Sequence, residues 1–123
     1  MRATLFLTVF FALLSTVLAA PALHKRGGNG RATYYSGYMM SDPACGGNAP
    51  NDDDMVAAVR SDSPFKCGDK VNLWRNGSKV SVTVVDHCDT CTSGHWFDLS
   101  KSAFSKLGAL TLGVMDDIVY WQD

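Results

Sequence analysis

Apolar and polar residues alternate along much of the chain after residue 30, and this pattern predicts short β-strands. Residues 31–36 alternate and contain adjacent tyrosines, residues 55–59 form a compact apolar run, and residues 117–121 are rich in β-branched and aromatic side chains. Residues 37–54 contain several glycines and prolines and a run of three aspartates, which together indicate a long loop.

The strongest local signal is a hairpin. Residues 71–74 and 80–85 flank Asn76-Gly77, a pair that tolerates the positive φ angles of a tight turn. With Ser78 this turn also forms an acceptor sequence for N-glycosylation at Asn76. In the second strand valines alternate with polar residues, so we expect one buried face of Val80, Val82 and Val84 opposite Ser81, Thr83 and Asp86.

One segment has helical spacing. Ser100 suits an N-cap, Ala103, Phe104 and Leu107 share one helix face, and Gly108 ends the helix. Short strands, one small helix and long loops together predict an all-β fold, a compact β-barrel rather than a sandwich or a helical bundle.

The N-terminal segment differs from the rest. Arg2 precedes the uncharged apolar segment Leu5–Leu14, and small residues follow, so residues 1–20 are expected to be a secretion signal. A membrane anchor is disfavoured because the apolar stretch is near the lower limit of about 17–25 residues. The dibasic pair Lys25-Arg26 then indicates a propeptide over residues 21–26; the alternative is two exposed charges in a flexible tail.

Charge is informative once this leader is set aside. The chain has eleven Lys and Arg; without Arg2, Lys25 and Arg26 eight remain, against twelve Asp, so residues 27–123 carry a net charge of −4. An acidic domain with scattered basic residues lacks the electrostatic footprint of a nucleic-acid-binding protein. Nothing after residue 20 is apolar enough to span a membrane. We expect one secreted, monomeric domain with neither nucleic acid nor membrane as a partner.

Four cysteines lie in this domain: Cys45, Cys67, Cys88 and Cys91. In a secreted domain of fewer than 100 residues, an even number of cysteines indicates disulfides, and four allow three pairings. We favour Cys45–Cys67 and Cys88–Cys91, because the second pair closes a tight local loop while the first joins distant segments.

A zinc site is the alternative use of two of these cysteines. His87, Cys88, Cys91 and His95 offer four ligands within nine residues. Thiolate zinc sites favour reducing compartments, however, and neighbouring side chains of an extended chain diverge. We therefore expect disulfides, with no metal and no cofactor.

Six short motifs follow one another along the chain. They are Ala32-Thr33-Tyr34-Tyr35, Ala44-Cys45-Gly46, Met55–Val59, Cys67-Gly68, the segment 82–88, and the segment 97–100 with Ala103-Phe104. In this order they resemble the double-psi β-barrel domains of the RlpA-like and barwin-like group, including small fungal expansin-like proteins of the loosenin type. The resemblance spans residues 30–122. It implies a six-stranded barrel with one or two short helices, stapled by disulfides, with a groove across one face and an association with wall polysaccharide.

Hydrolysis of a glycan requires two carboxyl groups that flank the scissile bond. Related endoglucanases carry one aspartate soon after the first-strand tyrosines and a second in a His-Phe-Asp-like segment. The segment His95–Asp98 resembles the second, whereas Ser36-Gly37-Tyr38 stands where the first is expected. Asp98 is therefore the leading candidate for the polar centre of the groove, with Asp86 as a weaker one. Other aspartates at 42 and 52–54 are alternatives for the missing partner.

Aromatic side chains are the candidates for packing on sugar rings: Tyr34, Tyr35, Tyr38 and Trp96, with His95 beside them. Trp74 and Trp121, within strands, are expected in the core or at the barrel rim. Asp98 has a structural alternative too, because an aspartate also suits the cap of the helix that follows.

Three function classes follow from these residues and the resemblance. The leading one is a non-hydrolytic, expansin-like protein that binds and loosens a wall polysaccharide such as cellulose, chitin or peptidoglycan. The second is a weak endoglucanase or lytic transglycosylase, which needs a partner carboxylate for Asp98. The third is a protein-binding role, as a cysteine-protease inhibitor or a host-directed effector, in which the loops rather than the groove carry the activity.

Overall fold

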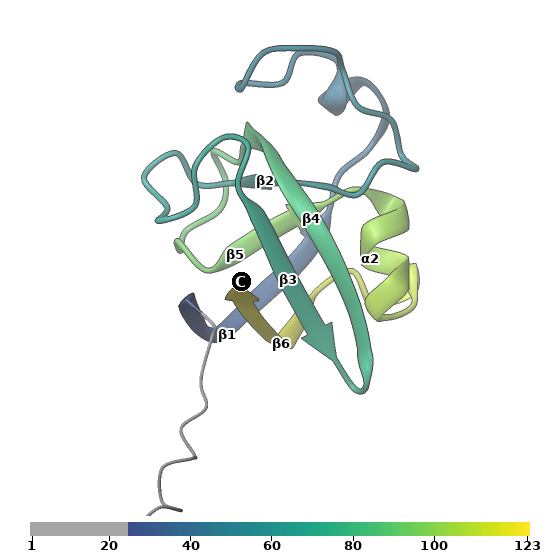
Figure 1. Ribbon diagram of the computed structural model, residues 1–123. Coiled ribbons are helices and arrows are strands. Elements are labelled where there is room, and N and C mark those ends of the chain that lie inside the picture. The colour runs from purple at the N-terminus through teal and green to yellow at the C-terminus, as the bar shows by residue number, and fades with distance from the viewer. Residues whose placement is uncertain (1–24) are drawn as a thin grey trace, which may run out of the picture.

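The computed structural model describes residues 25–123, in which six strands close into a barrel (Figure 1). Around the barrel the order is β1-β5-β2-β4-β3-β6, so the first and last strands are neighbours. The strands are β1 (Lys25–Tyr34), β2 (Val56–Val59), β3 (Lys70–Arg75), β4 (Ser78–His87), β5 (Trp96–Leu99) and β6 (Met115–Gln122).

Parallel and antiparallel pairs are mixed within this one barrel. β1 pairs in parallel with β5, and β2 in parallel with β4, while the other four neighbours pair antiparallel. All-β composition, closure and few helices agree with the predicted double-psi barrel. β5 is the strand that the alternation of polar and apolar residues did not predict, because its four residues are too few to establish a period.

The predicted hairpin is confirmed. β3 and β4 pair from Lys70↔Thr83 to Arg75↔Ser78, and both turn residues have positive φ, 49° for Asn76 and 86° for Gly77. Asn76 is exposed at this turn.

The prediction for the β4 faces is correct for the valines but wrong for Asp86. The burial pattern continues through Val80, Val82 and Val84 to Asp86, whose side chain is buried. A register shift in the β2–β4 pairing separates Asp86 from the valines: Val84 pairs with Ala57 of the main core, whereas Asp86 pairs with Ala58, which belongs to a second cluster.

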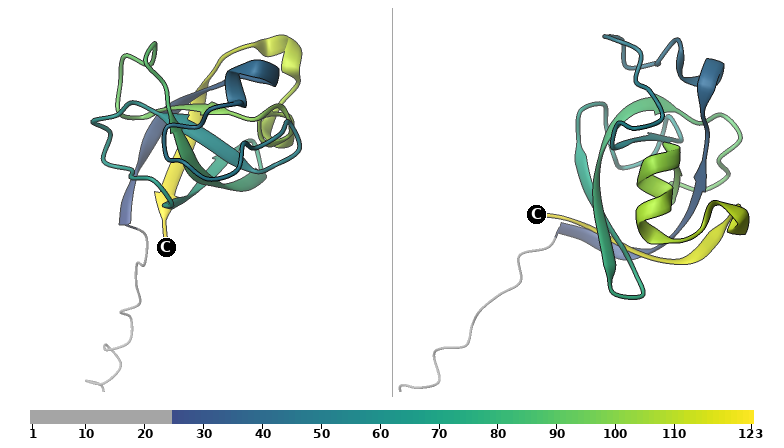
Figure 2. Two further views of the ribbon diagram at one scale, coloured as in Figure 1. Left: turned by 90° about the horizontal axis from the view of Figure 1, so that it is seen from above. Right: turned by 90° about the vertical axis from the view of Figure 1, so that its right-hand side faces the viewer.

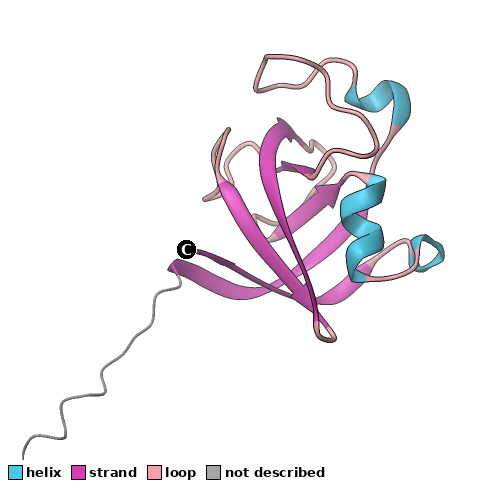
Figure 3. Cartoon of the chain, turned by 45° about the vertical axis from the view of Figure 1, so that its right-hand side comes forward, coloured by secondary structure: helices cyan, strands magenta, loops and turns pink. Residues whose placement is uncertain are grey.

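The core fills the barrel interior and extends under the helix α2 (Lys101–Leu107), which packs against one side of the barrel (Figures 2 and 3). Ser100 caps this helix as predicted, because its Oγ accepts a hydrogen bond from the Ala103 N–H at 3.2 Å. Ala103, Phe104 and Leu107 are all buried. The helix therefore joins the barrel core through the face predicted from its spacing.

A second, smaller cluster lies beside the main core. It contains Tyr35, Met40, Val56, Ala58, Cys88 and Cys91, with Val85 and Trp96 packed against it. The loop between β1 and β2, which begins with the 3₁₀ turn η2 (Gly37–Met40), extends beyond the barrel on this side (Figure 1). A second 3₁₀ turn, η3 (Leu110–Leu112), connects α2 to β6.

Both predicted disulfides are present, Cys45–Cys67 and Cys88–Cys91. The zinc alternative is therefore wrong, because the sulfur atoms of Cys88 and Cys91 are bonded to each other. The first bridge joins the long loop to the segment before β3, and the second closes a turn at the end of β4.

The expected secretion signal, residues 1–20, lies outside the described residues, as do residues 21–24 of the expected propeptide. Lys25 and Arg26 form the start of β1, where the backbone of Lys25 pairs with Gln122. In the described part of the chain, no helix has the length and apolar character needed to cross a bilayer.

Candidate functional site

Asp98 lies on β5, where the parallel register places it beside Thr33 of β1. The Thr33 hydroxyl donates a hydrogen bond of 2.7 Å to Asp98 Oδ1, and the Asp98 side chain is half-buried. Ser100, not Asp98, is the helix cap, so the structural alternative for Asp98 is wrong. The carboxyl is held between two strands and remains accessible to solvent.

Trp96 is connected to Asp98 through the Thr33 hydroxyl. Its indole Nε1 donates a hydrogen bond of 2.8 Å to Thr33 Oγ1, the same hydroxyl that bonds Asp98. The Arg31 guanidinium lies over the Trp96 ring, 4.9 Å from its centroid. One face of this indole is thus covered by a cation, and its N–H is used to orient Thr33.

Asp86 is brought to the same part of the barrel by β2. The backbone of Ala58 pairs with Asp86 on one side and with Asp98 on the other. Two strand spacings therefore separate the backbones of the two aspartates, roughly 10 Å. The small side chain of Ala58 lies between them in the second cluster.

The carboxyl group of Asp86 is committed to backbone donors. Its side chain is 8% exposed, and Oδ1 accepts hydrogen bonds of 2.8 Å from the backbone N–H groups of Ala44 and His87. These bonds tie the long loop to the end of β4. Asp86 therefore has a structural role in joining the loop to β4.

Tyr35 is buried among these groups. Its exposed fraction is 6%, and its hydroxyl has no hydrogen-bond partner in the described structure. Burial, and then the negative charges of Asp86 and Asp98, raise the pKa of Tyr35, so the phenol stays protonated. The prediction that Tyr35 lines an open groove is wrong, because the side chain packs inside the second cluster.

The same surroundings act on Asp98. Burial raises the pKa of the Asp98 carboxyl, the hydrogen bond from Thr33 opposes this change, and the charge of Asp86 adds to it. A carboxyl with a raised pKa keeps its proton to a higher pH and can donate a hydrogen bond in mildly acid solution. Such a group suits a polar contact with a glycosidic or hydroxyl oxygen.

The other predicted aromatic residues are dispersed. Tyr34 is partly buried and packs edge-on against Phe104 of the core, with the ring centroids 4.9 Å apart. Tyr38 is 85% exposed on η2, beyond the barrel. Trp74 is exposed on β3 rather than in the core. The aromatic candidates for packing on sugar rings are therefore not gathered in one cluster.

His95 bonds a neighbouring strand rather than the Asp98 side chain. Its Nδ1 and the Tyr120 hydroxyl are 2.6 Å apart, and the two rings stack with centroids 5.4 Å apart. His95 and Trp96 are adjacent, yet they approach different groups, Tyr120 of β6 and Thr33 of β1.

The alternative partners for Asp98 are used elsewhere. Asp52 accepts a hydrogen bond from the Gly37 N–H, Asp53 accepts one from Ser102, and Asp54 accepts one from the Asn51 N–H. These bonds shape the loop and tie it to α2. Asp42 is exposed in the same loop.

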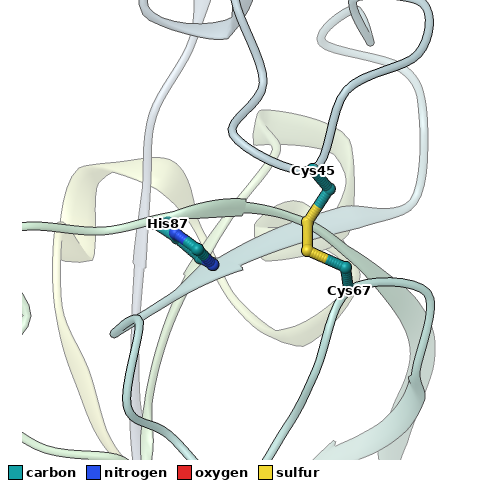
Figure 4. A group of neighbouring side chains, drawn as sticks. All are labelled: Cys45, Cys67 and His87. Carbon is teal, nitrogen blue, oxygen red and sulfur yellow. A yellow bond between two sulfur atoms is a disulfide. The ribbon is translucent and has the colours of Figure 1, made fainter.

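One group of potential metal ligands occurs in the described part of the chain. The ligand atoms of Cys45, Cys67 and His87 lie within 4.8 Å of one another (Figure 4). The two sulfur atoms are joined as a disulfide and present no thiolate, so this group does not hold a metal in the oxidised protein.

Comparison with known proteins places this barrel in a family. A sequence profile for double-psi β-barrel domains, described as lytic transglycolase, matches residues 28–120. The chain belongs to the RlpA-like double-psi β-barrel family. The resemblance inferred from the six motifs is therefore confirmed.

Two relatives in this family carry different names. The chain is 31% identical over 127 residues to expansin-like protein 5 of Dictyostelium discoideum, a match that covers 93% of this chain and 52% of the relative. It is 35% identical over 104 residues to the papain inhibitor of Streptomyces mobaraensis, covering 74% of this chain and 68% of the inhibitor. The chain thus spans about half the length of its expansin-like relative.

Among solved structures, a papain inhibitor and an expansin are also similar to this chain. The Streptomyces papain inhibitor superposes with a TM-score of 0.67 at 27% identity, covering 80% of this chain and 94% of that one. An aspartate-to-asparagine mutant of Clavibacter michiganensis expansin, solved in complex with cellohexaose, superposes with a TM-score of 0.64 at 32% identity, covering 79% and 50%.

Proposed function

We propose that this protein is a secreted, non-hydrolytic, expansin-like protein that binds and loosens cell-wall polysaccharide. The observation that carries the proposal is the half-buried Asp98 carboxyl, held by Thr33, whose pKa is raised by burial and by the charge of Asp86. A carboxyl in this state can exchange hydrogen bonds with a glycan that would otherwise bond to its neighbouring chains.

The state of Asp86 supports binding without hydrolysis. An inverting hydrolase needs a second carboxylate that activates water on the far side of the sugar ring. Asp86 is close in the fold, but it is buried and its Oδ1 accepts two backbone hydrogen bonds. We infer that its charge adds to the raised pKa of Asp98 and that its hydrogen bonds fix the loop, while Asp98 is the one of these two aspartates that contacts the glycan.

The similarity to expansins supports the same class of ligand. The relative and the structural neighbour named above are expansin-like, and the neighbour's crystal contained cellohexaose. We therefore take a β-linked glucan such as cellulose as the polymer to test, with chitin and peptidoglycan beside it.

The test is the creep of polysaccharide strips under constant load. Wild-type protein should increase the extension rate without releasing reducing sugars. Asp98→Asn keeps the size and the bond to Thr33 and should lose about tenfold or more of this effect. Because the change creates an N-glycosylation acceptor sequence with Leu99 and Ser100, all proteins are made in a host that does not glycosylate. Asp89→Asn, an exposed loop aspartate, is the matched control and should behave as wild type. Loosening by Asp98→Asn at the wild-type rate would refute the proposal, and sugar release would indicate a glycosidase.

A cysteine-protease inhibitor is the second candidate. The papain inhibitor is matched over 94% of its chain, whereas the expansin is matched over half. Tyr38 and Met39 are 85% and 52% exposed on η2, in a loop that the Cys45–Cys67 bridge holds in place. Exposed apolar side chains on a constrained loop suit the contact of an inhibitor with its protease.

Titration of papain separates the two candidates. An inhibitor should lower papain activity in proportion to its concentration, Asp98→Asn should retain this effect, and Tyr38→Ser should weaken it about tenfold or more. Absence of inhibition by wild-type protein would exclude the second candidate.

Secretion and processing complete the proposal. Residues 1–20 would be removed as a signal and cleavage after Arg26 would leave residues 27–123, with a glycan carried at the exposed Asn76. The mass of the secreted protein, before and after enzymatic deglycosylation, tests each of these steps.

A further inference from the structure

A pocket of about 340 Å³ lies on the flank of the barrel, across β1 from β5 to β6. It is lined by residues of β1, β6 and the segment that leads into β5: Asn29, Gly30, Arg31, Asp116, Thr92, Ser93, His95 and Trp96. Asp98, Asp86 and Tyr35 are not among its lining residues. This volume is at the lower end of the range for small-molecule sites, about 300–1,000 Å³.

The polar groups of this pocket are held in fixed positions. Arg31 Nε donates to Asp116 Oδ1 at 2.6 Å, and its guanidinium rests on the Trp96 ring. Within the described structure no hydrogen bond is made by the terminal Nη groups of Arg31. The Asp116 side chain is 67% exposed. A planar donor and a carboxylate acceptor therefore stand side by side at the pocket.

His95 supplies a second oriented polar group. Its ring stacks on Tyr120, and Nδ1 lies 2.6 Å from the Tyr120 hydroxyl. Burial raises the pKa of Tyr120, so this hydroxyl keeps its proton. The contact with Tyr120 fixes the orientation of the His95 ring, which offers its second nitrogen, Nε2, for a hydrogen bond.

We propose that this pocket binds one neutral hexopyranose unit of the wall polysaccharide, an inference that rests on the proposed function and names its ligand class. Each sugar hydroxyl can both accept and donate a hydrogen bond. Two adjacent hydroxyls can therefore accept from Arg31 and donate to Asp116. One cation and one anion leave the pair neutral. A uronate or an amino sugar would meet one like charge and one opposite charge that is already paired, so neither gains from its own charge at this site.

The pocket is connected to Asp98 through Trp96. The indole contacts Arg31 at the pocket and donates to Thr33, which in turn donates to Asp98. A sugar unit bound at Arg31 is therefore connected to Asp98 through Trp96 and Thr33. In this way the pocket determines which unit of the glycan reaches Asp98.

Isothermal titration with soluble hexasaccharides tests the inference. The probes are cellohexaose, which is neutral, hexagalacturonate, which is acidic, and glucosamine hexamer, which is cationic. Wild-type protein should prefer cellohexaose, and Asp116→Ala should bind it about tenfold or more weakly, because a charge-assisted hydrogen bond is lost. Arg31→Gln is a second variant with the same expected loss.

A matched control lies one residue along β6. Asp117 accepts from Arg75 Nε at 2.7 Å, the same type of exposed pair, and it does not line the pocket. Asp117→Ala should bind cellohexaose as wild type does. Equal affinities of wild type and Asp116→Ala, tighter binding of either charged hexamer, or no binding of any hexamer would overturn the inference.

Strip creep separates this inference from the proposed function. Loosening that depends on Asp98, together with unchanged cellohexaose binding by Asp116→Ala, would refute the pocket alone. Cellohexaose binding that depends on Asp116, without loosening of any wall polymer, would refute the proposed function and leave the pocket as a sugar site.

Discussion

At the residue scale, the site is a set of polar contacts between side chains far apart in the sequence. Trp96 donates to Thr33, Thr33 donates to Asp98, and Asp98 lies across Ala58 from Asp86. These residues come from different strands of the barrel. The raised pKa of Asp98 therefore depends on how those strands pair.

The raised pKa of Asp98 predicts a pH dependence of stability. Its native pKa is above the unfolded value of 3.8, so ionisation favours the unfolded chain. The stabilising contribution is complete below pH 3.8 and is lost as the pH rises through the native pKa. Asp98→Asn lacks this titration, so wild type should lose stability relative to the variant as the pH rises above 3.8 and through the native pKa of Asp98.

Urea unfolding at several pH values measures this difference. For the exposed Asp89→Asn, the difference in unfolding free energy from wild type should not vary with pH over the same range. A pH-independent difference for Asp98→Asn would show that the native and unfolded pKa values of Asp98 are the same.

Trp96→Phe tests the connection from the indole to Thr33. The variant keeps an aromatic ring but loses the N–H donor, which should cost about 1–2 kcal/mol and lower Tm by roughly 5–10 °C. Trp74→Phe, on an exposed ring, should change the unfolding free energy by less than about 0.5 kcal/mol. Thermal unfolding followed by circular dichroism gives both values; an unchanged Tm for Trp96→Phe would contradict the assigned hydrogen bond.

Sequence reasoning selected Asp98 as a candidate but did not identify the residues that connect it to its neighbours. Asp98 stands in a short recognisable motif, whereas the roles of Thr33 and Ala58 arise only when β1, β5 and β2 pair. Tyr35 was expected at the surface, yet it follows the end of β1 and turns into the second cluster. Because β1 ends between Tyr34 and Tyr35, the alternation of faces along the strand does not tell which way the Tyr35 side chain points.

At the element scale, local signals were sufficient for the hairpin and the helix. Asn76-Gly77 sets the turn with its positive φ angles, and Ser100 and Gly108 bound α2. β5 has no comparable signal, because a four-residue strand is defined by its partners β1 and β2 rather than by its own pattern. Strands with a local signal, such as the apolar run of β2, were predicted, and β5, which has no such signal, was not.

Removal of the helix cap is the prediction for this scale. Ser100→Ala leaves the Ala103 N–H without its acceptor in a buried setting, which should cost about 1 kcal/mol. Ser105→Ala, exposed in the same helix, should be neutral or slightly stabilising. Chemical denaturation of the two variants compares them; equal stabilities would exclude a capping role for Ser100.

At the scale of the whole molecule, the disulfides differ in the length of chain that they close. Cys45–Cys67 spans 22 residues and Cys88–Cys91 spans three. In the chain-entropy account, the longer loop gives about 3 kcal/mol of stabilisation and the shorter one about 1.5 kcal/mol. Replacing Cys45 and Cys67 with serine should therefore destabilise the domain more than replacing Cys88 and Cys91.

Unfolding midpoints of the two double variants test this order. Intact mass of the oxidised wild type should be four hydrogens below that of the reduced chain. A larger loss of stability on removal of the Cys88–Cys91 bridge would show that loop packing, not chain entropy, dominates its contribution.

The pairing of β1 with β6 has a consequence for how the protein is made. The barrel cannot close until the ribosome has released the chain through Gln122, because the last strand is the neighbour of the first. Until then β1 and β3 each present an unpaired edge, and such edges invite association with other chains. A nascent chain that folds late is also one that can be threaded across a membrane before it folds.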